Sequence, residues 1–175
     1  MTIIDAIMSR QSIRYYLDKD IDDDIIKELI KAGCQAPSAH NRQPWSFIVT
    51  KNKDKMNEIA VNSTYAKFLP TASAAIIVCS HFDPLQQIPA LPSPNLHSSQ
   101  DAAAAAENIL LAALDHGLGT CWIGDINDAL LRRLFDIPDD YRPMLIIALG
   151  YPDPMHMTPK RKRRPLDEVL HWNMW

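Results

Sequence analysis

The sequence predicts one mixed α+β domain that spans residues 1–175. Segments with helical periodicity alternate along the chain with a few short apolar runs of strand length. No internal repeat and no linker suggests a second domain. A chain of 175 residues is long enough to bury one hydrophobic core, so a single domain is expected.

The first part of the chain is predicted to hold two capped helices and a loop. Thr2 can cap a first helix, which carries apolar residues at helical spacing and ends near Arg10. Asp22 can cap a second helix, and Gly33 marks its end. Residues 36–44 place small polar residues between two prolines, which predicts a loop.

The composition of residues 45–98 predicts two strands, a short helix and a loop. Residues 45–49 predict a strand, and a short polar helix is expected over residues 54–61. Residues 74–79 form a continuous apolar run, which is typical of a strand covered on both faces. Residues 82–98 contain four prolines and predict a loop or a lid rather than a regular element.

The remaining elements lead to a polar, basic tail that begins at residue 151. Residues 100–116 have the strongest helical pattern, and their alanine run suggests close packing on several sides. A short strand or turn is expected over residues 120–124, and an amphipathic helix over residues 127–135. Residues 144–150 predict a central strand.

Composition narrows the possible partners. The formal net charge of −3 gives no general attraction to nucleic acid or to an anionic membrane. The first residues do not have the pattern of a signal peptide, and no apolar run reaches membrane-spanning length. Three widely spaced cysteines argue against a disulfide framework or a zinc site. We therefore expect a cytoplasmic protein without nucleic-acid, membrane or metal partners.

Alternate positions near the start of the chain carry Arg10, Ser12 and Arg14. In an extended backbone, alternate side chains point to one side, so two guanidinium groups and a hydroxyl would face the same volume. This arrangement is well suited to holding a phosphate. The alternative is a solvated strand edge with surface arginines.

Two further segments offer polar contacts. Ser38, Asn41 and Gln43 provide donors and acceptors that could recognise a polar ring or a ribityl chain, unless the loop is only a structural turn. The run over residues 160–164 holds five of the 18 Lys and Arg residues, and it could also be a solvated tail.

Several common sites are missing from the sequence. The chain has only five glycines and contains neither a Gly-x-Gly-x-x-Gly fingerprint nor a Walker loop, so any phosphate must be held by side chains. There is no nucleophile elbow and no histidine pair with the spacing of a zinc hydrolase. No protein nucleophile, acid or base can be singled out as catalytic.

Taken in order, these segments resemble the FMN-dependent nitroreductase family. The resemblance lies in residues 10–14, 36–45, 107–113, 117–124, 149–152 and 161–166, which together extend over nearly the whole chain. In the stretch before the second strand, over residues 65–70, only Lys67 could stand in for the basic flavin contacts of larger members.

The resemblance implies a fold and an activity. The fold would have a central, mostly antiparallel sheet flanked by helices, and two chains would form an intertwined homodimer with FMN at the interface. NADH or NADPH would reduce the FMN in a ping-pong cycle, and a nitroaromatic, quinone or similar acceptor would reoxidise it. Alternatives are reductive dehalogenation, enone reduction or flavin fragmentation on the same scaffold, or a non-catalytic polyanion-binding protein.

The resemblance also implies the FMN contacts. Arg10 and Ser12 would face the phosphate, Arg14 would lie nearer the ribityl chain or the pyrimidine edge, and Arg161 and Arg163 would close on the phosphate. The other implied contacts are Gln11 beside them, Ser38, Ala39, Asn41 and Gln43 toward the FMN of the partner subunit, and Trp122, Ile123 and Gly124 along the isoalloxazine.

Overall fold

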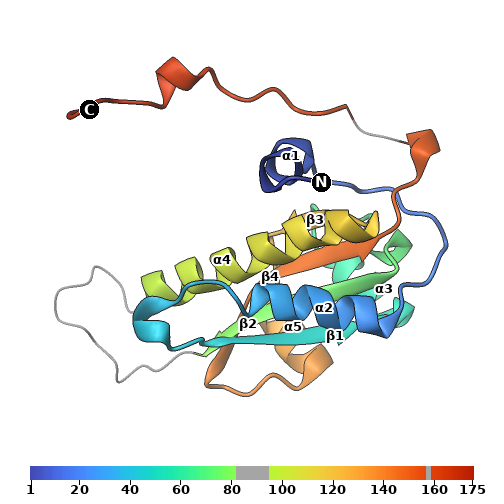
Figure 1. The fold of residues 1–175 in the computed structure, drawn as a ribbon. Helices are drawn as coiled ribbons and strands as arrows, with labels where there is room; N and C mark the ends of the chain where they lie inside the picture. The colour runs from blue at the N-terminus through green and yellow to red at the C-terminus, as the bar shows by residue number, and fades with distance from the viewer. Residues whose placement is uncertain (82–94, 157–158) are drawn as a thin grey trace.

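A four-stranded antiparallel sheet forms the centre of the structure, a computed structural model that describes residues 1–81, 95–156 and 159–175. The strands are β1 (Trp45–Thr50), β2 (Ala74–His81), β3 (Gly119–Ile123) and β4 (Tyr141–Gly150), in the order β1-β2-β4-β3 (Figure 1). Each neighbouring pair is antiparallel. The predicted α+β class with an antiparallel sheet is therefore confirmed.

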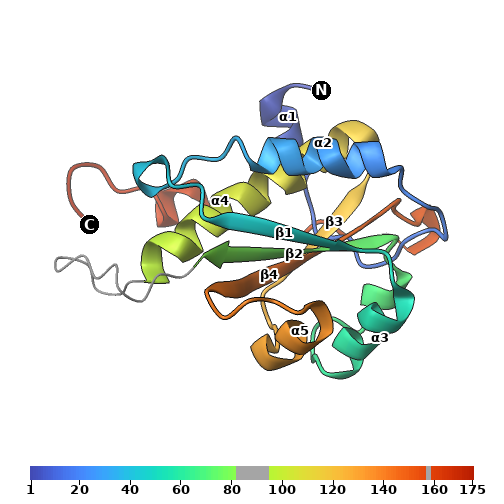
Figure 2. The ribbon, with the colours of Figure 1, turned by 90° about the horizontal axis from the view of Figure 1, so that it is seen from below.

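Helices cover both faces of this sheet. Figure 2 shows α2 (Asp23–Gly33) and α4 (Asn95–Ala112) on one face, and α3 (Lys53–Val61) and α5 (Asp128–Phe135) on the other. Each face has its own hydrophobic core, because apolar stripes of the helices pack on alternate residues of the strands. The result is a three-layer arrangement with two cores.

Strand β2 belongs to both cores. Ile76 packs toward α2 and α4, while Ile77 packs toward α3 and α5, and neither is accessible to solvent. This explains the continuous apolar run of the sequence, because a central strand with two covered faces has no polar side. Pro143 of β4 lies at the register shift between Val78 and Cys79, where a strand tolerates the missing N–H.

Capping residues set the beginnings of the helices. Thr2 and Asp5 form a capping box at the start of α1 (Ile3–Ser9), and the Asp22 carboxylate accepts from the backbone N–H of Asp24 at the start of α2. The Asn127 side chain caps α5 in the same way. The predicted positions of these three helices are confirmed.

The start of α4 differs from the expectation. The sequence predicts a loop or lid through residue 98, but α4 already begins at Asn95. The last of the four prolines is Pro94, so nothing after it prevents helix formation. The rest of the expected loop, residues 82–94, lies outside the described residues. At its other end α4 continues as the 3₁₀ turn η3 (Ala113–His116), and Gly117 follows with a φ of 66°.

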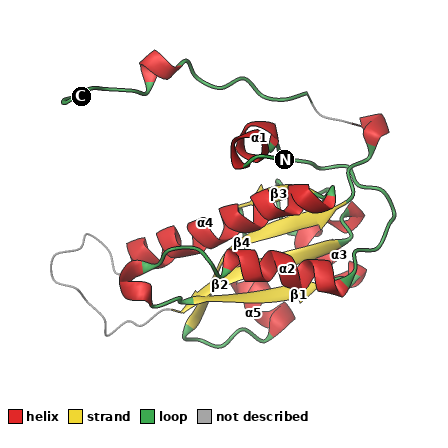
Figure 3. Cartoon of the chain, viewed as in Figure 1, coloured by secondary structure: helices red, strands yellow, loops and turns green. Residues whose placement is uncertain are grey.

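The two ends of the chain lie away from the cores. No residue of α1 is buried, and residues 159–175 are all exposed. In the described residues after β4, the short turns η4 (Pro154–His156) and η5 (Leu166–Glu168) are the helical elements, and Pro152 forms an isolated antiparallel bridge with Tyr16 (Figure 3). Among the helices described, none is long and apolar enough to cross a membrane.

Candidate functional site

The segment after α1 is fixed along the edge of the sheet. The backbone N–H of Ile13 donates to Thr120 O of β3 at 2.8 Å, and that of Leu17 donates to Tyr151 O at 2.9 Å. The Tyr16 hydroxyl donates to Ile13 O at 2.6 Å. These bonds hold the segment in an extended conformation, as its alternating pattern predicts.

Two glycines let this segment approach the sheet closely. A Cβ atom at Gly119 would lie 2.8 Å from Cγ1 of Ile13, and one at Gly150 would lie 2.6 Å from Cδ1 of Tyr16. Real side chains do not tolerate such distances, so both positions require glycine for the segment to lie where it does.

The extended segment lines a pocket of about 240 Å³ together with the start of the C-terminal tail. Ile13 points into the core, whereas its neighbours face the pocket. The pocket thus combines residues from opposite ends of the sequence, and its walls are Arg10, Gln11, Ser12, Arg14, Pro159, Lys160, Arg161 and Arg163.

This pocket is strongly basic. Five of its lining side chains are cations, and none is a carboxylate. Outside the lining, Glu107 Oε1 lies 3.7 Å from Arg10 Nε. Within the described part of the chain, Arg161 and Arg163 form no ion pair. The excess of positive charge makes the pocket a suitable site for an anion with several oxygens.

A second pocket, of about 350 Å³, adjoins the first. Arg14 borders both pockets, and its guanidinium carbon lies 5.8 Å from the centre of the Phe68 ring. The walls of this second pocket are Arg14, Tyr65, Cys121, Trp122, Ile123, Gly124 and Asp125. The two pockets together could hold a ligand with an anionic end and a planar end.

Cys121 forms a neutral part of this wall. Burial raises the pKa of its thiol, while the charge of Arg14, a hydrogen bond from Ser12 and the charge of Arg10 act in the opposite direction. Burial is the largest effect, so the thiol keeps its proton at neutral pH. The side chain therefore contributes shape rather than a reactive thiolate.

Hydrogen bonds hold the conformation of the loop over residues 38–43. Asp101 of α4 accepts a hydrogen bond from the backbone N–H of Ala39 at 3.1 Å, and Ser38 Oγ accepts from the backbone N–H of Gln43 at 2.9 Å. His40, Asn41 and Gln43 all have positive φ values, between 51° and 54°. These bonds hold a backbone that non-glycine residues seldom adopt.

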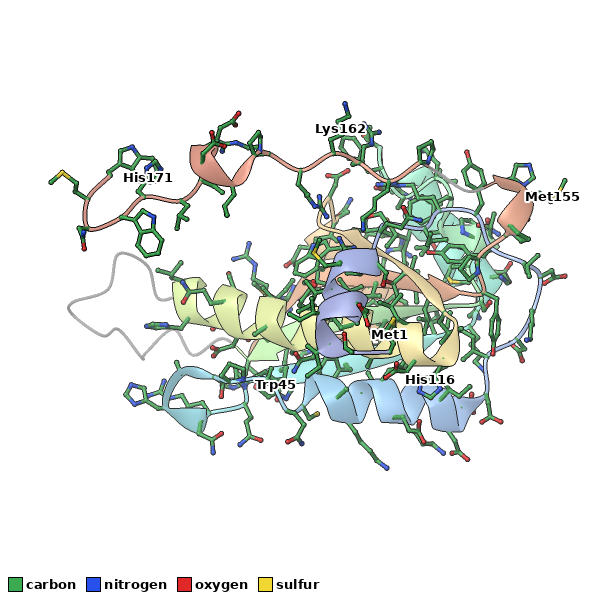
Figure 4. The ribbon with its side chains drawn as sticks, turned by 45° about the horizontal axis from the view of Figure 1, so that its top comes forward. Met1, Trp45, His116, Met155, Lys162 and His171 are labelled. Atoms are coloured by element: carbon green, nitrogen blue, oxygen red, sulfur yellow. The ribbon has the colours of Figure 1, made fainter. Side chains whose placement is uncertain are left out.

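This loop does not reach the basic pocket of its own chain. None of residues 38–43 lines either pocket, and Figure 4 shows Lys162 of the basic run near the top of the view and Trp45, two residues after Gln43, well below it. The structure therefore separates Ser38, Ala39, Asn41 and Gln43 from the other predicted contacts. A role for these four residues at the site of a partner subunit stays a prediction.

Sequence reasoning missed several residues of the two pockets. Lys160 was recognisable only as part of the basic run, and Tyr65, Cys121 and Asp125 carried no local signal. Lys67 does not line either pocket, and its Nζ donates to Val61 O at 3.1 Å. In the described ranges, no group of three or more His, Cys, Asp or Glu side chains could hold a metal ion.

Comparisons with known proteins match most of the chain to one family. A family model described as the nitroreductase family matches residues 7–64 and 60–151. A protein of Archaeoglobus fulgidus, provisionally named NADH dehydrogenase/NAD(P)H nitroreductase, is 40% identical over 150 residues, which cover 83% of each chain. The FMN reductase (NADPH) of Bacillus subtilis is 26% identical over 185 residues, covering 98% of this chain and 74% of the relative.

A solved structure extends the likeness to the fold. A protein of Bacteroides thetaiotaomicron that carries the same provisional name superposes with a TM-score of 0.84 and 30% identity. The superposition covers 99% of this chain and 98% of that one.

Proposed function

This chain belongs to the nitroreductase family, and on that premise we propose that it passes electrons from NAD(P)H through FMN to an organic acceptor. The proposed cycle is ping-pong: NAD(P)H would give its electrons to the flavin and leave, and a nitroaromatic, quinone or similar acceptor would then bind in its place and take them up. The enzyme is thus a flavin-dependent NAD(P)H oxidoreductase.

The observation that carries the proposal is the pair of adjoining pockets. A phosphate monoester is a dianion with three peripheral oxygens, and the basic pocket offers forked guanidinium donors from Arg10, Arg161 and Arg163. The Ser12 hydroxyl adds a further donor. The donor set therefore fits the phosphate of FMN, and these four residues would hold it.

The second pocket fits the ring system. Trp122, Ile123 and Gly124 would lie along the isoalloxazine, and Arg14 would reach from the phosphate side toward its polar edge. Bound FMN supplies the hydride chemistry, so the chain needs no nucleophile of its own. A cation at Arg14 would stabilise negative charge that develops on a reduced ring.

An intertwined homodimer is part of the same proposal. Ile3 and Ile4 of α1 are 78% and 67% exposed, and Trp172 of the tail is 78% exposed. Apolar side chains this exposed at both ends of a chain are typical of surfaces that a second copy covers. In such a dimer the loop over residues 38–43 would contact the FMN of the partner subunit.

A visible spectrum of the purified protein tests the proposal first. We expect flavin absorbance, or its appearance after added FMN, and bleaching of that absorbance when NADH or NADPH is titrated in without oxygen. A colourless protein that takes up no FMN would contradict the proposal. Parallel titrations identify the preferred nicotinamide, and turnover with nitroaromatic, quinone, enone and halogenated acceptors distinguishes the possible reactions.

A further inference from the structure

One carboxylate borders the second pocket. Asp125 directly follows Gly124 after the end of β3, and it is the acidic member of the pocket lining. The same lining contains one cation, Arg14. In the part of the chain that the structure describes, Asp125 forms no ion pair, so no neighbouring side chain neutralises its negative charge. The pocket therefore presents one charge of each sign.

Ser63 sets the position of this carboxylate. Ser63 Oγ lies 3.4 Å from Asp125 Oδ2 and 3.5 Å from Asp125 O. The same oxygen accepts hydrogen bonds from the backbone N–H groups of Tyr65 and Ala66, at 3.2 and 3.1 Å. Because these two bonds use its acceptor positions, the hydroxyl proton is left to donate to Asp125. Asp125 is thereby joined to the loop that places Tyr65 on the wall of the pocket.

Arg14 and Asp125 have different surroundings once FMN is bound. In the proposed function Arg14 faces the polar edge of the ring, and the acceptor binds over the ring in the same pocket. Asp125 is then the charged lining residue that remains to face the acceptor. None of the lining residues belongs to α1 or to the C-terminal tail, the segments assigned to the proposed dimer interface, so the dimer leaves this wall in place.

We propose that Asp125 is a specificity-determining residue that makes the enzyme prefer aromatic acceptors with a cationic substituent to those with a carboxylate. The negative charge attracts the first class and repels the second. The aromatic faces of Tyr65 and Trp122, in the same lining, act in the same direction, because they attract cations. This inference rests on the proposed function, and it adds the charge class of the acceptor.

Two nitrobenzenes of opposite charge test the preference. The holoenzyme is assayed with 4-nitrobenzoate and with (4-nitrobenzyl)trimethylammonium, and kcat/KM is measured for each acceptor. Removal of one charge from the pocket should change kcat/KM about fivefold for each acceptor, in opposite directions. The ratio of cationic to anionic acceptor should therefore fall about tenfold or more in Asp125→Asn. The different intrinsic reactivities of the acceptors cancel, because each is compared with itself across the variants.

Binding of unreactive analogues gives a second measurement. Benzoate and benzyltrimethylammonium carry the same charges but have no reducible group, and the flavin absorbance of the oxidised holoenzyme reports their binding. We expect benzyltrimethylammonium to bind more tightly than benzoate, and Asp125→Asn to raise its Kd about fivefold. Asp125→Lys should reverse the preference, because it places a positive charge at the same position.

Asp54→Asn is the matched control. It removes the same charge from an exposed position in the first turn of α3, and Asp54 lines neither pocket. The acceptor ratio should stay within about twofold in this variant, because solvent screens surface charges. An equal change in the Asp54 and Asp125 variants, or no change in either, would overturn the inference while the proposed function stands. A protein that takes up no flavin would overturn both.

Discussion

Arg14 connects the two parts of the site at the scale of single residues. It borders both pockets, and it lies near the buried thiol of Cys121. Burial raises the pKa of this thiol, and the charge of Arg14 is the largest effect that lowers it. One guanidinium group thus influences both the basic pocket and the ring-sized pocket. Arg10 is more specialised, because it lines only the basic pocket and is close to Glu107.

Arg10→Ala should weaken FMN binding without unfolding the protein. A hydrogen bond to a charged group contributes about 1.5–3 kcal/mol, so the Kd for FMN should rise about 10- to 150-fold. Flavin fluorescence titration measures this change. Arg133→Ala is the matched control, because Arg133 pairs with Glu58 on the opposite face of the sheet and lines neither pocket. Equal FMN affinity in both variants would exclude Arg10 from the phosphate site.

The sequence predicted those site residues that share a local pattern. Arg10, Ser12 and Arg14 alternate along an extended segment, so their spacing suggested a phosphate site, whereas Arg161 and Arg163 were assigned to it only by the family resemblance. Tyr65 and Asp125 could not be found in this way. They line a pocket only because the fold brings their loops next to β3, and neither has a neighbour in the sequence that marks it.

At the scale of elements, the site depends on how closely the segment over residues 10–17 packs on β3 and β4. Gly119→Ala should destabilise the protein by about 1–3 kcal/mol, because the new Cβ would lie 2.8 Å from both Ile13 Cγ1 and Pro152 Cγ. Gly124→Ala should change stability by less than about 0.5 kcal/mol, since its nearest neighbour, Trp122 Nε1, would be 3.5 Å away.

Urea unfolding at neutral pH measures both glycine variants. Because Ile13 and Ser12 are adjacent, displacement of the segment in the Gly119 variant should also weaken FMN binding. A Gly119→Ala protein as stable as the Gly124→Ala protein would show that the segment shifts without cost.

The positions of helices and strands were predictable where capping residues or an apolar run mark them in the local sequence. Asp22 and Asn127 cap α2 and α5, and a continuous apolar run identifies β2 at the centre of the sheet. The start of α4 was not predictable, because four prolines made the preceding segment look irregular as far as residue 98. The separation of the loop over residues 38–43 from the basic pocket also depends on tertiary packing, through Asp101 of α4.

At the scale of the whole molecule, stability should fall at alkaline pH. Burial is the main cause that raises the pKa values of Tyr16, Cys79 and Cys121, which share one core, and it raises that of Cys79 from 9.0 to about 11. Above pH 9 the unfolded thiol loses its proton, while the folded thiol keeps it until about pH 11. The free energy of unfolding is therefore at its full value below pH 9 and declines as the pH approaches 11.

Each unit of pKa difference corresponds to about 1.4 kcal/mol, so Cys79 alone should account for about 2 kcal/mol of the decline between pH 8 and pH 10.5. Urea unfolding at pH 8 and pH 10.5 measures it. Cys79→Ala should show a smaller decline between these pH values than the unsubstituted protein, although its stability at pH 8 is lower. Substitution of the exposed Cys34 by Ser should leave the decline unchanged.

The proposed homodimer predicts that substitutions in α1 weaken dimer formation. Ile4 is 67% exposed and α1 buries none of its residues, so in a monomer Ile4→Ser should change stability by less than about 0.5 kcal/mol. If a second copy covers α1, the same substitution should raise the dimer dissociation constant about tenfold or more, because serine buries less apolar surface in the interface than isoleucine does. Light scattering over a concentration series measures this constant. Val61→Ser, at a position 74% exposed on α3, is the control that should leave it unchanged. A protein that stays monomeric at every concentration would contradict the dimer and leave the exposed residues of α1 unexplained.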